Sequence, residues 1–259
     1  MALLEEDEHL LAGLTGEAWE RVGRRLTPDL AVISLPALLA LPSGLQKRVL
    51  RQALGQLNPG QEITLAQVES LLALAQARKS GGQVACGTVQ AARAGAELHL
   101  WRRLPLPLEE PTPLSAPGEW QTPDGWRLRL EVRPCPPKLS CPGPAAACFD
   151  AGGVSLPLVL RHFRAGDRFW PLGGPGTRKL QDFLVDCKIP RWLRPHLPLV
   201  ESGGRIVWVA GLRTAEDAKM TPETRQMLAL EITPVSPYAV RVWEMLTALV
   251  SRKTTEQLG

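Results

Sequence analysis

The spacing of the hydrophobic residues changes near residue 83, and this change constrains the fold more than any other feature of the sequence. Before it, apolar residues recur every three or four positions, as Leu45, Val49, Ala53 and Leu57 do, which is typical of amphipathic helices. After it, apolar and polar residues alternate in short runs, which is typical of strands. We therefore expect an α+β chain: a helical domain with a small β-rich extension, followed by a compact mixed α/β C-terminal domain.

The helical domain is expected to span residues 1–82. Pro42 cannot continue a helix interior, so it divides the apolar run around it into a short helix and a longer one. Thr64 followed by Gln67 has the spacing of a capping box and predicts the start of another helix. The Ser-Gly-Gly at 80–82 is expected to end that helix.

Residues 83–155 are expected to form a β-rich, Pro-rich extension of this first domain. Two stretches, 104–118 and 134–148, carry so many prolines that they predict irregular structure. Between them, alternating apolar residues flank Asp124 and Gly125, a dipeptide typical of hairpin turns, so a hairpin is expected there.

Residues 156–233 are expected to form the C-terminal domain, with a short helix from Arg178 to Cys187 and a β-hairpin that turns at a second Ser-Gly-Gly. Residues 234–259 are expected to form a helical tail that Ser236 caps. The tail either docks on the body of the protein or on a partner, and docking on the body is favoured.

The basic residues are concentrated in one part of the chain, whose net charge is +4. Residues 156–233 hold 12 Lys and Arg against 8 Asp and Glu, whereas residues 1–155 hold 15 against 16. This concentration is expected if one face there meets a polyanion, although a solvated basic face is the common alternative.

Several classes of function are not supported. No apolar run approaches the roughly 20 residues of a membrane span, and the acidic N-terminus does not resemble a secretory signal. Cys135, Cys141 and Cys148 lack the spacing of a zinc site, so no metal site is assigned, and free thiols in a reducing cytoplasm are expected. The histidines have no carboxylate or serine at motif spacing, and no residue is assigned to catalysis.

Gly166, Asp167 and Arg168 form the most conspicuous polar cluster. They are either a catalytic trio or, as we favour, part of a loop that a buried Asp–Arg pair organises, with Arg168 turned outward. Phe169 and Trp170 are expected to pack in the core, or to contact a nucleic acid by shape, rather than to stack on its bases. The same expectation holds for Trp192.

Asp182 and Asp186 lie four residues apart, on one face of the expected helix. A carboxylate dyad is conceivable, but pairing with Lys179 or Lys188 is the ordinary explanation.

Four segments, 156–173, 177–200, 206–213 and 221–230, together resemble a known family. Their motifs are a Gly-Asp-Arg-Phe loop, a Lys-Leu-x-Asp-Phe helix, a Lys-x-Pro-Arg turn and a Trp-Val-x-Gly-Leu-Arg strand. In order and spacing they are similar to the last domain of bacterial tRNA(Ile)-lysidine synthetase. The Leu-Pro-x-x-Leu-Gln helix that begins at Leu41 resembles the preceding domain of that family.

The resemblance implies an ATP- and magnesium-dependent ligase of the cytoplasm, which joins lysine to the anticodon wobble cytidine of tRNA-Ile. The family's catalytic domain has a Ser-Gly-Gly-x-Asp-Ser phosphate loop, and neither Ser-Gly-Gly here continues in that way. We therefore expect this chain to hold the tRNA without catalysing the reaction and to have no cofactor of its own. A separate N-terminal catalytic domain is a possible partner.

The family's last domain is expected to hold the acceptor stem of the tRNA through phosphate contacts. The resemblance places seven basic residues near those phosphates: Arg168, Arg178, Lys179, Lys188, Arg191, Arg194 and Arg213. Two alternatives remain open. The chain is a protein–protein interaction module derived from the family, or it is an independent enzyme whose site has no recognisable motif.

Overall fold

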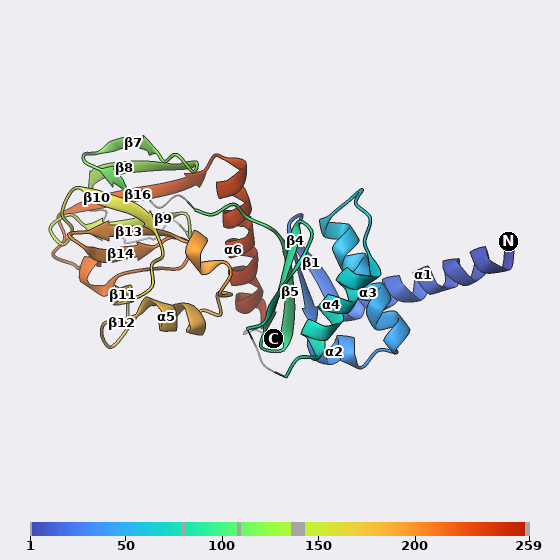
Figure 1. The fold of residues 1–259 in the computed structure, drawn as a ribbon. Coiled ribbons are helices and arrows are strands. Elements are labelled where there is room, and N and C mark those ends of the chain that lie inside the picture. Colours follow the sequence, from blue (N-terminus) through green and yellow to red (C-terminus); the bar gives the residue numbers. More distant parts are fainter. Residues whose placement is uncertain (1, 79–80, 108–109, 136–142, 257–259) are drawn as a thin grey trace. The chain divides into compact units, whose positions relative to one another are not determined.

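The computed structural model describes residues 2–78, 81–107, 110–135 and 143–256, and it divides into two compact units (Figure 1). Unit 1 comprises Met1–Leu104 and unit 2 comprises Pro105–Gly259. Helices and antiparallel strands occur in both, which confirms the α+β class. None of the described helices is long and apolar enough to cross a membrane.

Unit 1 combines four helices with one five-stranded antiparallel sheet of order β1-β2-β5-β4-β3. The helices α3 and α4 pack on this sheet, and their buried leucines and valines form one core with the inward residues of β2, β4 and β5. The elements are α1 (Ala2–Val22), β1 (Gly23–Thr27), β2 (Leu30–Ser34), α2 (Leu35–Leu39), α3 (Ser43–Leu57), α4 (Leu65–Gln76), β3 (Gln83–Cys86), β4 (Val89–Ala94) and β5 (Glu97–Arg102).

The local signals in unit 1 are confirmed where they concern helices. The chain leaves α2 before Pro42 and begins α3 at Ser43. The capping box at the start of α4 is present: the Gln67 backbone N–H donates to the Thr64 hydroxyl, and the Gln67 side chain accepts from the Thr64 backbone. Helix α4 ends at Gln76, before the glycines.

The expectation that residues 1–82 are helical throughout was wrong for the hairpin β1–β2. Strand β2 is a continuous apolar run, Leu-Ala-Val-Ile, because it lies inside the sheet and all four of these side chains are buried. A short run of this kind has no alternation, so its period does not distinguish a buried strand from a helix.

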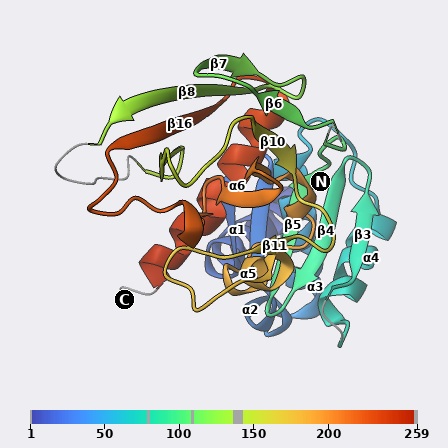
Figure 2. The same cartoon turned by 90° about the vertical axis from the view of Figure 1, so that its left-hand side faces the viewer.

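Unit 2 contains two larger antiparallel sheets, of order β15-β14-β13-β10-β6 and β7-β8-β16-β9, and the small ladder β11–β12. Figure 2 shows the long strands β8 and β16 running side by side. The strands are β6 (Thr112–Leu114), β7 (Gly118–Gln121), β8 (Trp126–Pro134), β9 (Ala146–Asp150), β10 (Leu158–His162), β11 (Arg168–Phe169), β12 (Arg178–Lys179), β13 (Pro198–Ser202), β14 (Arg205–Val209), β15 (Arg213–Thr214) and β16 (Gln226–Pro234). The helices are α5 (Leu180–Asp186), the 3-10 turns η1 (Arg194–His196) and η2 (Glu216–Ala218), and α6 (Pro237–Glu256).

The predicted extension of residues 83–155 is divided between the two units. Strands β3, β4 and β5 complete the sheet of unit 1, because β5 pairs with β2. Strands β7, β8 and β9 belong to unit 2, because β16 lies between β8 and β9 and pairs with both. The Pro-rich stretch 104–118 is not wholly irregular, since β6 pairs with β10. Residues 136–142 of the second Pro-rich stretch, including Cys141, lie outside the described residues.

The predicted hairpins and the helical tail are confirmed. The turn at Asp124 and Gly125 joins β7 to β8, and the second Ser-Gly-Gly turn joins β13 to β14. Helix α6 begins as expected, with the Ser236 hydroxyl accepting from the Ala239 backbone N–H. Its apolar face docks on unit 2, where Trp243 meets Trp126 edge to face at 6.1 Å between ring centroids.

Candidate functional site

A buried arginine organises the loop between β10 and α5. Arg161 is only 6% exposed, and its guanidinium donates to both carboxylate oxygens of Asp167 at 2.8 and 2.9 Å. It also donates to Glu201 Oε1 at 2.7 Å. Burial disfavours the charged guanidinium, but the bonds to Glu201 and Asp167 outweigh it and hold the pKa of Arg161 above its usual value. The expected Asp–Arg pair is therefore present, with Arg161 as the arginine.

Asp167 transmits this anchoring to the loop and to α5. Its carboxylate accepts the backbone N–H of Arg164 at 2.8 Å, and its carbonyl oxygen accepts the N–H of Leu180, the first residue of α5, at 2.8 Å. Gly166 makes the turn possible with φ of 94°, a left-handed conformation that side chains disfavour. The loop ends are thus tied to one buried ion cluster.

The ladder β11–β12 places two cations opposite each other. Arg168 pairs in register with Lys179, and Phe169 pairs with Arg178. Directly opposed residues project from the same face of a ladder, and like charges there are mutually destabilising. Both side chains are exposed, and no acidic partner for either one occurs among the described residues. The outward orientation expected for Arg168 is confirmed.

Arg178, on the opposite face of the ladder, is only half-exposed and forms an ion pair with Asp186 at 2.7 Å. The expectation that Asp186 pairs with Lys179 or Lys188 was therefore wrong. The helix predicted to start at Arg178 begins two residues later, at Leu180, because Arg178 and Lys179 form strand β12. That short strand carries Arg178 to the side of α5 where Asp186 lies.

The end of α5 presents further cations. Lys188 adopts φ of 51°, and the chain closes the helix with N–H bonds from Lys188 to the Val185 carbonyl and from Ile189 to the Leu184 carbonyl. This is the Schellman arrangement, which usually uses glycine at the left-handed position. The Lys188 side chain is exposed there.

Two arginines follow in the next turn. Arg194 donates to the Ile189 carbonyl at 3.0 Å. Burial, with the nearby charge of Arg191, lowers the pKa of Arg194. Arg191 itself is exposed. The structure thus brings a second pair of cations together just beyond α5.

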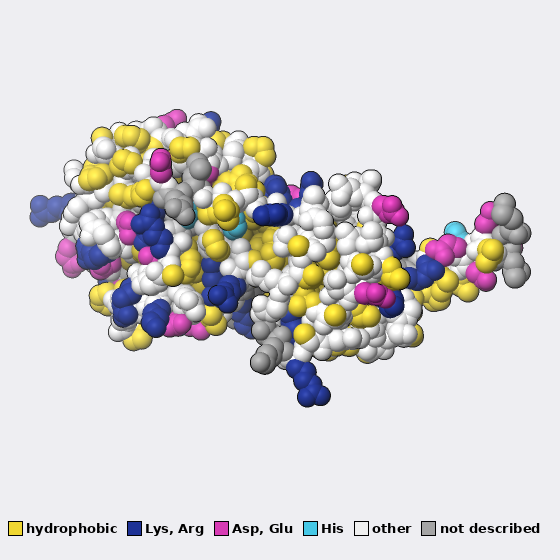
Figure 3. Space-filling model, viewed as in Figure 1, with side chains coloured by type: hydrophobic (Ala, Val, Ile, Leu, Met, Phe, Trp, Pro, Cys, Tyr) yellow, Lys and Arg dark blue, Asp and Glu magenta, His cyan; other side chains and the backbone are white. Residues whose placement is uncertain are grey.

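We refer to the exposed cations around α5 as the cationic surface: Arg168, Lys179, Lys188 and Arg191. In Figure 3, dark blue side chains gather over the region where Figure 1 shows β11, β12 and α5. Arg213 is also exposed, but it lies on β15 at the edge of a different sheet. The seven residues predicted to contact RNA therefore divide into this surface, the half-buried Arg178 and Arg194, and the separate Arg213.

The aromatic residues beside this surface pack mainly into the core. Phe169 is 1% exposed and meets Phe183 edge to face at 5.2 Å. Trp192 is also buried. Trp170 differs, because it is 37% exposed while its indole N–H donates to the Gly174 carbonyl at 2.9 Å.

The structure reveals histidine partners that spacing in the sequence does not indicate. His162 bonds to Asp124, 38 residues away, at 2.7 Å between Nε2 and Oδ2. His196 Nδ1 lies 3.0 Å from the Tyr238 hydroxyl on α6. Both contacts connect separate elements of unit 2. Within the described part of the chain, no three His, Cys, Asp or Glu side chains are grouped to hold a metal ion.

Neither Ser-Gly-Gly is built as a phosphate loop. Gly203 and Gly204 form the tight β13–β14 turn with φ of 54° and 75°. Gly81 and Gly82 lie after the end of α4, and Gly82 and Gly81 exchange backbone hydrogen bonds with Arg93. A phosphate cradle instead needs backbone N–H groups that open a helix.

Comparison with known families covers both units. The family model described as "TilS substrate binding domain" matches residues 33–99, and the one described as "TilS substrate C-terminal domain" matches residues 158–231. A solved structure, "Crystal structure of TILS C-terminal domain", aligns to 49% of this chain and 99% of its own, with 29% identity and a TM-score of 0.42.

Two curated relatives are both named tRNA(Ile)-lysidine synthase. The tRNA(Ile)-lysidine synthase of Geobacter sulfurreducens is 30% identical over 234 residues, which are 89% of this chain and 50% of that protein. That of Symbiobacterium thermophilum is 33% identical over 254 residues, again 89% of this chain and 50% of the relative. The chain thus spans about half the length of these relatives.

The family model that matches residues 33–99 describes a substrate-binding domain, so this chain is of the substrate-binding class. It belongs to the tRNA(Ile)-lysidine synthase family and corresponds to the C-terminal, substrate-binding half of those proteins.

Proposed function

We propose that the cationic surface of unit 2 holds a tRNA by its phosphates, and that this tRNA is the isoleucine tRNA on which the family's relatives are named to act. The observation that carries the proposal is the opposition of Arg168 and Lys179 on a two-residue ladder without an acidic partner among the described residues. An RNA phosphate between them supplies the missing counter-charge. The support from comparison is that residues 158–231 match the model described as "TilS substrate C-terminal domain" and residues 33–99 match the one described as "TilS substrate binding domain".

The side chains suit this role chemically. Guanidinium groups bind two phosphate oxygens at once, and ammonium groups bind as point charges, so the pair accepts phosphates in several orientations. Lys188, Arg191 and Arg213 add contacts to the backbone without reading bases. About four to six such contacts give a steep dependence of affinity on salt, with a slope of roughly −0.7 to −0.9 for each contact.

The catalytic step belongs, in this proposal, to a separate N-terminal domain like that of the longer relatives. There, ATP and magnesium serve the joining of lysine to the wobble cytidine, in the cytoplasm. The chain itself takes the binding role, without a cofactor of its own. A protein–protein interaction module remains the alternative, and the outcome of the following test distinguishes the two.

The test measures the dissociation constant of tRNA-Ile for the chain at about 50 and 200 mM salt, by electrophoretic shift or fluorescence anisotropy. Replacement of Arg168 and Lys179 by alanine together is expected to weaken binding roughly tenfold or more at the lower salt concentration. It should also make the salt slope shallower by about 1.5, because two phosphate contacts are lost.

The matched control is Arg127→Ala, which removes an exposed cation of β8 in the same unit. It should leave affinity and salt slope unchanged. Absence of tRNA binding at low salt, or equal effects of the control and the double variant, would contradict the proposal. A protein partner whose capture is insensitive to the double variant would favour the interaction module.

A further inference from the structure

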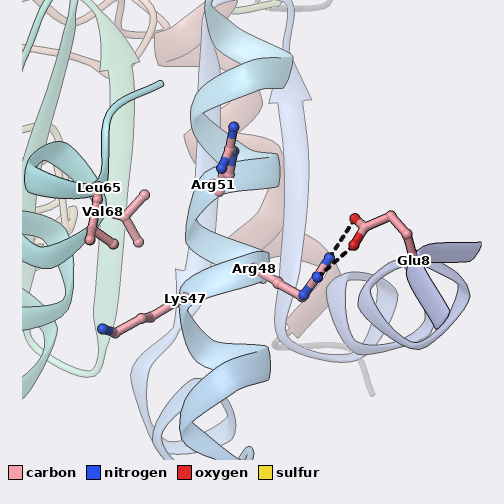
Figure 4. Close-up of a pocket in the computed structure, with 6 residues that line it drawn as sticks. All are labelled: Glu8, Lys47, Arg48, Arg51, Leu65 and Val68. Carbon is pink, nitrogen blue, oxygen red and sulfur yellow. Dashed lines mark hydrogen bonds and ion pairs between the residues drawn. The ribbon is translucent and has the colours of Figure 1, made fainter. Parts of the chain in front are cut away.

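Unit 1 contains a cavity of about 480 Å³ between α1, α3 and α4. Figure 4 shows its lining: Lys47, Arg48 and Arg51 lie along α3, Glu8 reaches across from α1, and Leu65 and Val68 face α3 from α4. Three of the six lining residues are cations, and one is an acid. The cavity therefore has a basic wall and an apolar wall.

The cations on α3 are crowded. Lys47 and Arg51 are four residues apart and therefore neighbours on one helix face, an arrangement that is unfavourable for like charges. Lys47 is bonded to Glu69 on α4 at 3.3 Å. For Arg51 no ion pair or side-chain hydrogen bond occurs among the described residues, and its side chain is exposed. The basic wall therefore has Arg51, a cation without an ion pair in the described part of the chain, beside Lys47, which has one.

Arg48 also has an acidic partner, and that pair has a particular geometry. Its two terminal nitrogens donate to the two oxygens of Glu8, each at 2.9 Å. A carboxylate bound in this parallel manner occupies the same positions as two oxygens of a phosphate. Glu8 is 65% exposed, so the acid can leave Arg48 without unfolding the core. Arg48 first and Arg51 more weakly hold the pKa of Glu8 below its usual value, so both cations act on this acid.

The apolar wall argues for a nucleotide over a simple anion. Leu65 is 64% exposed and offers a surface for a sugar or base, while the basic wall takes the phosphate. The cavity's α3 and α4 residues all lie within residues 33–99, the range that matches the substrate-binding family model, whereas Glu8 lies before it. The acid that covers the basic wall thus comes from outside the matched range.

We propose that this cavity is a second site for the RNA backbone, and that Glu8 is a competing anion that an RNA phosphate displaces from Arg48. The inference rests on the proposed function of the chain and adds to it a site in unit 1 and a restraint on that site. Binding at the cavity releases Glu8, after which Arg48 and Arg51 share the phosphate.

The test uses the whole chain and tRNA-Ile, again at about 50 and 200 mM salt. Replacement of Arg48 and Arg51 by alanine is expected to weaken binding by about fivefold and to make the salt slope shallower by roughly 1.5. Glu8→Gln keeps an oxygen acceptor but removes the competing charge, so it should strengthen binding by about threefold at the lower salt concentration. Arg78→Ala removes an exposed cation of unit 1 outside the cavity and should have no effect.

The outcomes are distinguishable from those of the proposed function. A silent Arg48/Arg51 variant, with the Arg168/Lys179 variant still weakening binding, overturns the cavity site and leaves the proposed function standing. Absence of tRNA binding by the unaltered chain overturns both. If Glu8→Gln lowers the melting temperature without raising affinity, Glu8 is a structural tie and the restraint is overturned. If polyglutamate, but not tRNA, loses affinity in the Arg48/Arg51 variant, the cavity serves an acidic protein instead.

Discussion

The cations that line the cavity of unit 1 and those on the β11–β12 ladder of unit 2 differ in their surroundings. Unit 1 has 11 Lys and Arg against 10 Asp and Glu, and unit 2 has 19 against 16. In unit 1, Arg48 and Lys47 are each bonded to a glutamate. In unit 2, Arg168 and Lys179 face each other across a ladder. The two units therefore differ little in net charge, and the surroundings of these particular cations are what indicate a surface suited to a polyanion.

The largest expected effect concerns the buried cluster that supports the cationic surface. Arg161→Met leaves the carboxylates of Asp167 and Glu201 without their cation, and both are largely buried. We expect unit 2 to lose about 3–5 kcal/mol of unfolding free energy, measured by urea denaturation. Arg205→Met breaks an exposed ion pair with Asp217 and should cost under about 1 kcal/mol. Equal losses in the two variants would show that burial does not set the strength of these pairs.

The next effect depends on pH. Burial, with the nearby charge of His162, lowers the pKa of His196 to about 4, below its usual value of 6.5. Between pH 6.5 and 4, His196 therefore binds a proton in the unfolded chain but stays neutral in the folded chain. Stability should fall by up to ~3 kcal/mol as the pH drops from 6.5 towards 4, and this loss should level off below 4. Urea denaturation of the native chain and of His196→Gln across this range checks it, and an unchanged pH dependence in the variant would refute it.

The smallest expected effect comes from a variant that gives Arg168 an acidic partner, as Arg48 has in unit 1. Lys179→Glu places an acid opposite Arg168, which should stabilise the ladder by about 0.5 kcal/mol while it weakens tRNA binding. Thermal denaturation and the tRNA affinity assay measure the two changes together. Arg127→Glu, the matched charge reversal on β8, should alter neither property. If Lys179→Glu lowers both stability and affinity, repulsion at this ladder is not the property that RNA relieves.

Local signals predicted the local elements, and the division between units required long-range pairing. The capping box of α4, the turn at Asp124 and Gly125 and the cap of α6 all lie within a few residues of the structure they specify. The assignment of β8 and β9 to unit 2 depends on β16, which follows them by more than seventy residues.

The same distinction holds for the site. The outward orientation of Arg168 and the role of Asp167 as an acceptor followed from the loop sequence. The partner of Asp167 did not, because Arg161 becomes buried only when β13 brings Glu201 beside it. The basic wall of unit 1 was also missed, since its cations are balanced by nearby acids and leave no excess in the charge count.

The place of β16 in its sheet affects the synthesis of the protein. Strand β16 lies between β8 and β9, so until residues 226–234 have left the ribosome β8 has, in the described sheet, only β7 beside it and β9 lacks the strand it pairs with. Unit 1 closes its sheet with residues that end at Arg102 and can fold while the remainder is still being translated. A nascent chain halted before Gln226 would thus carry a finished first unit and an open, aggregation-prone second one.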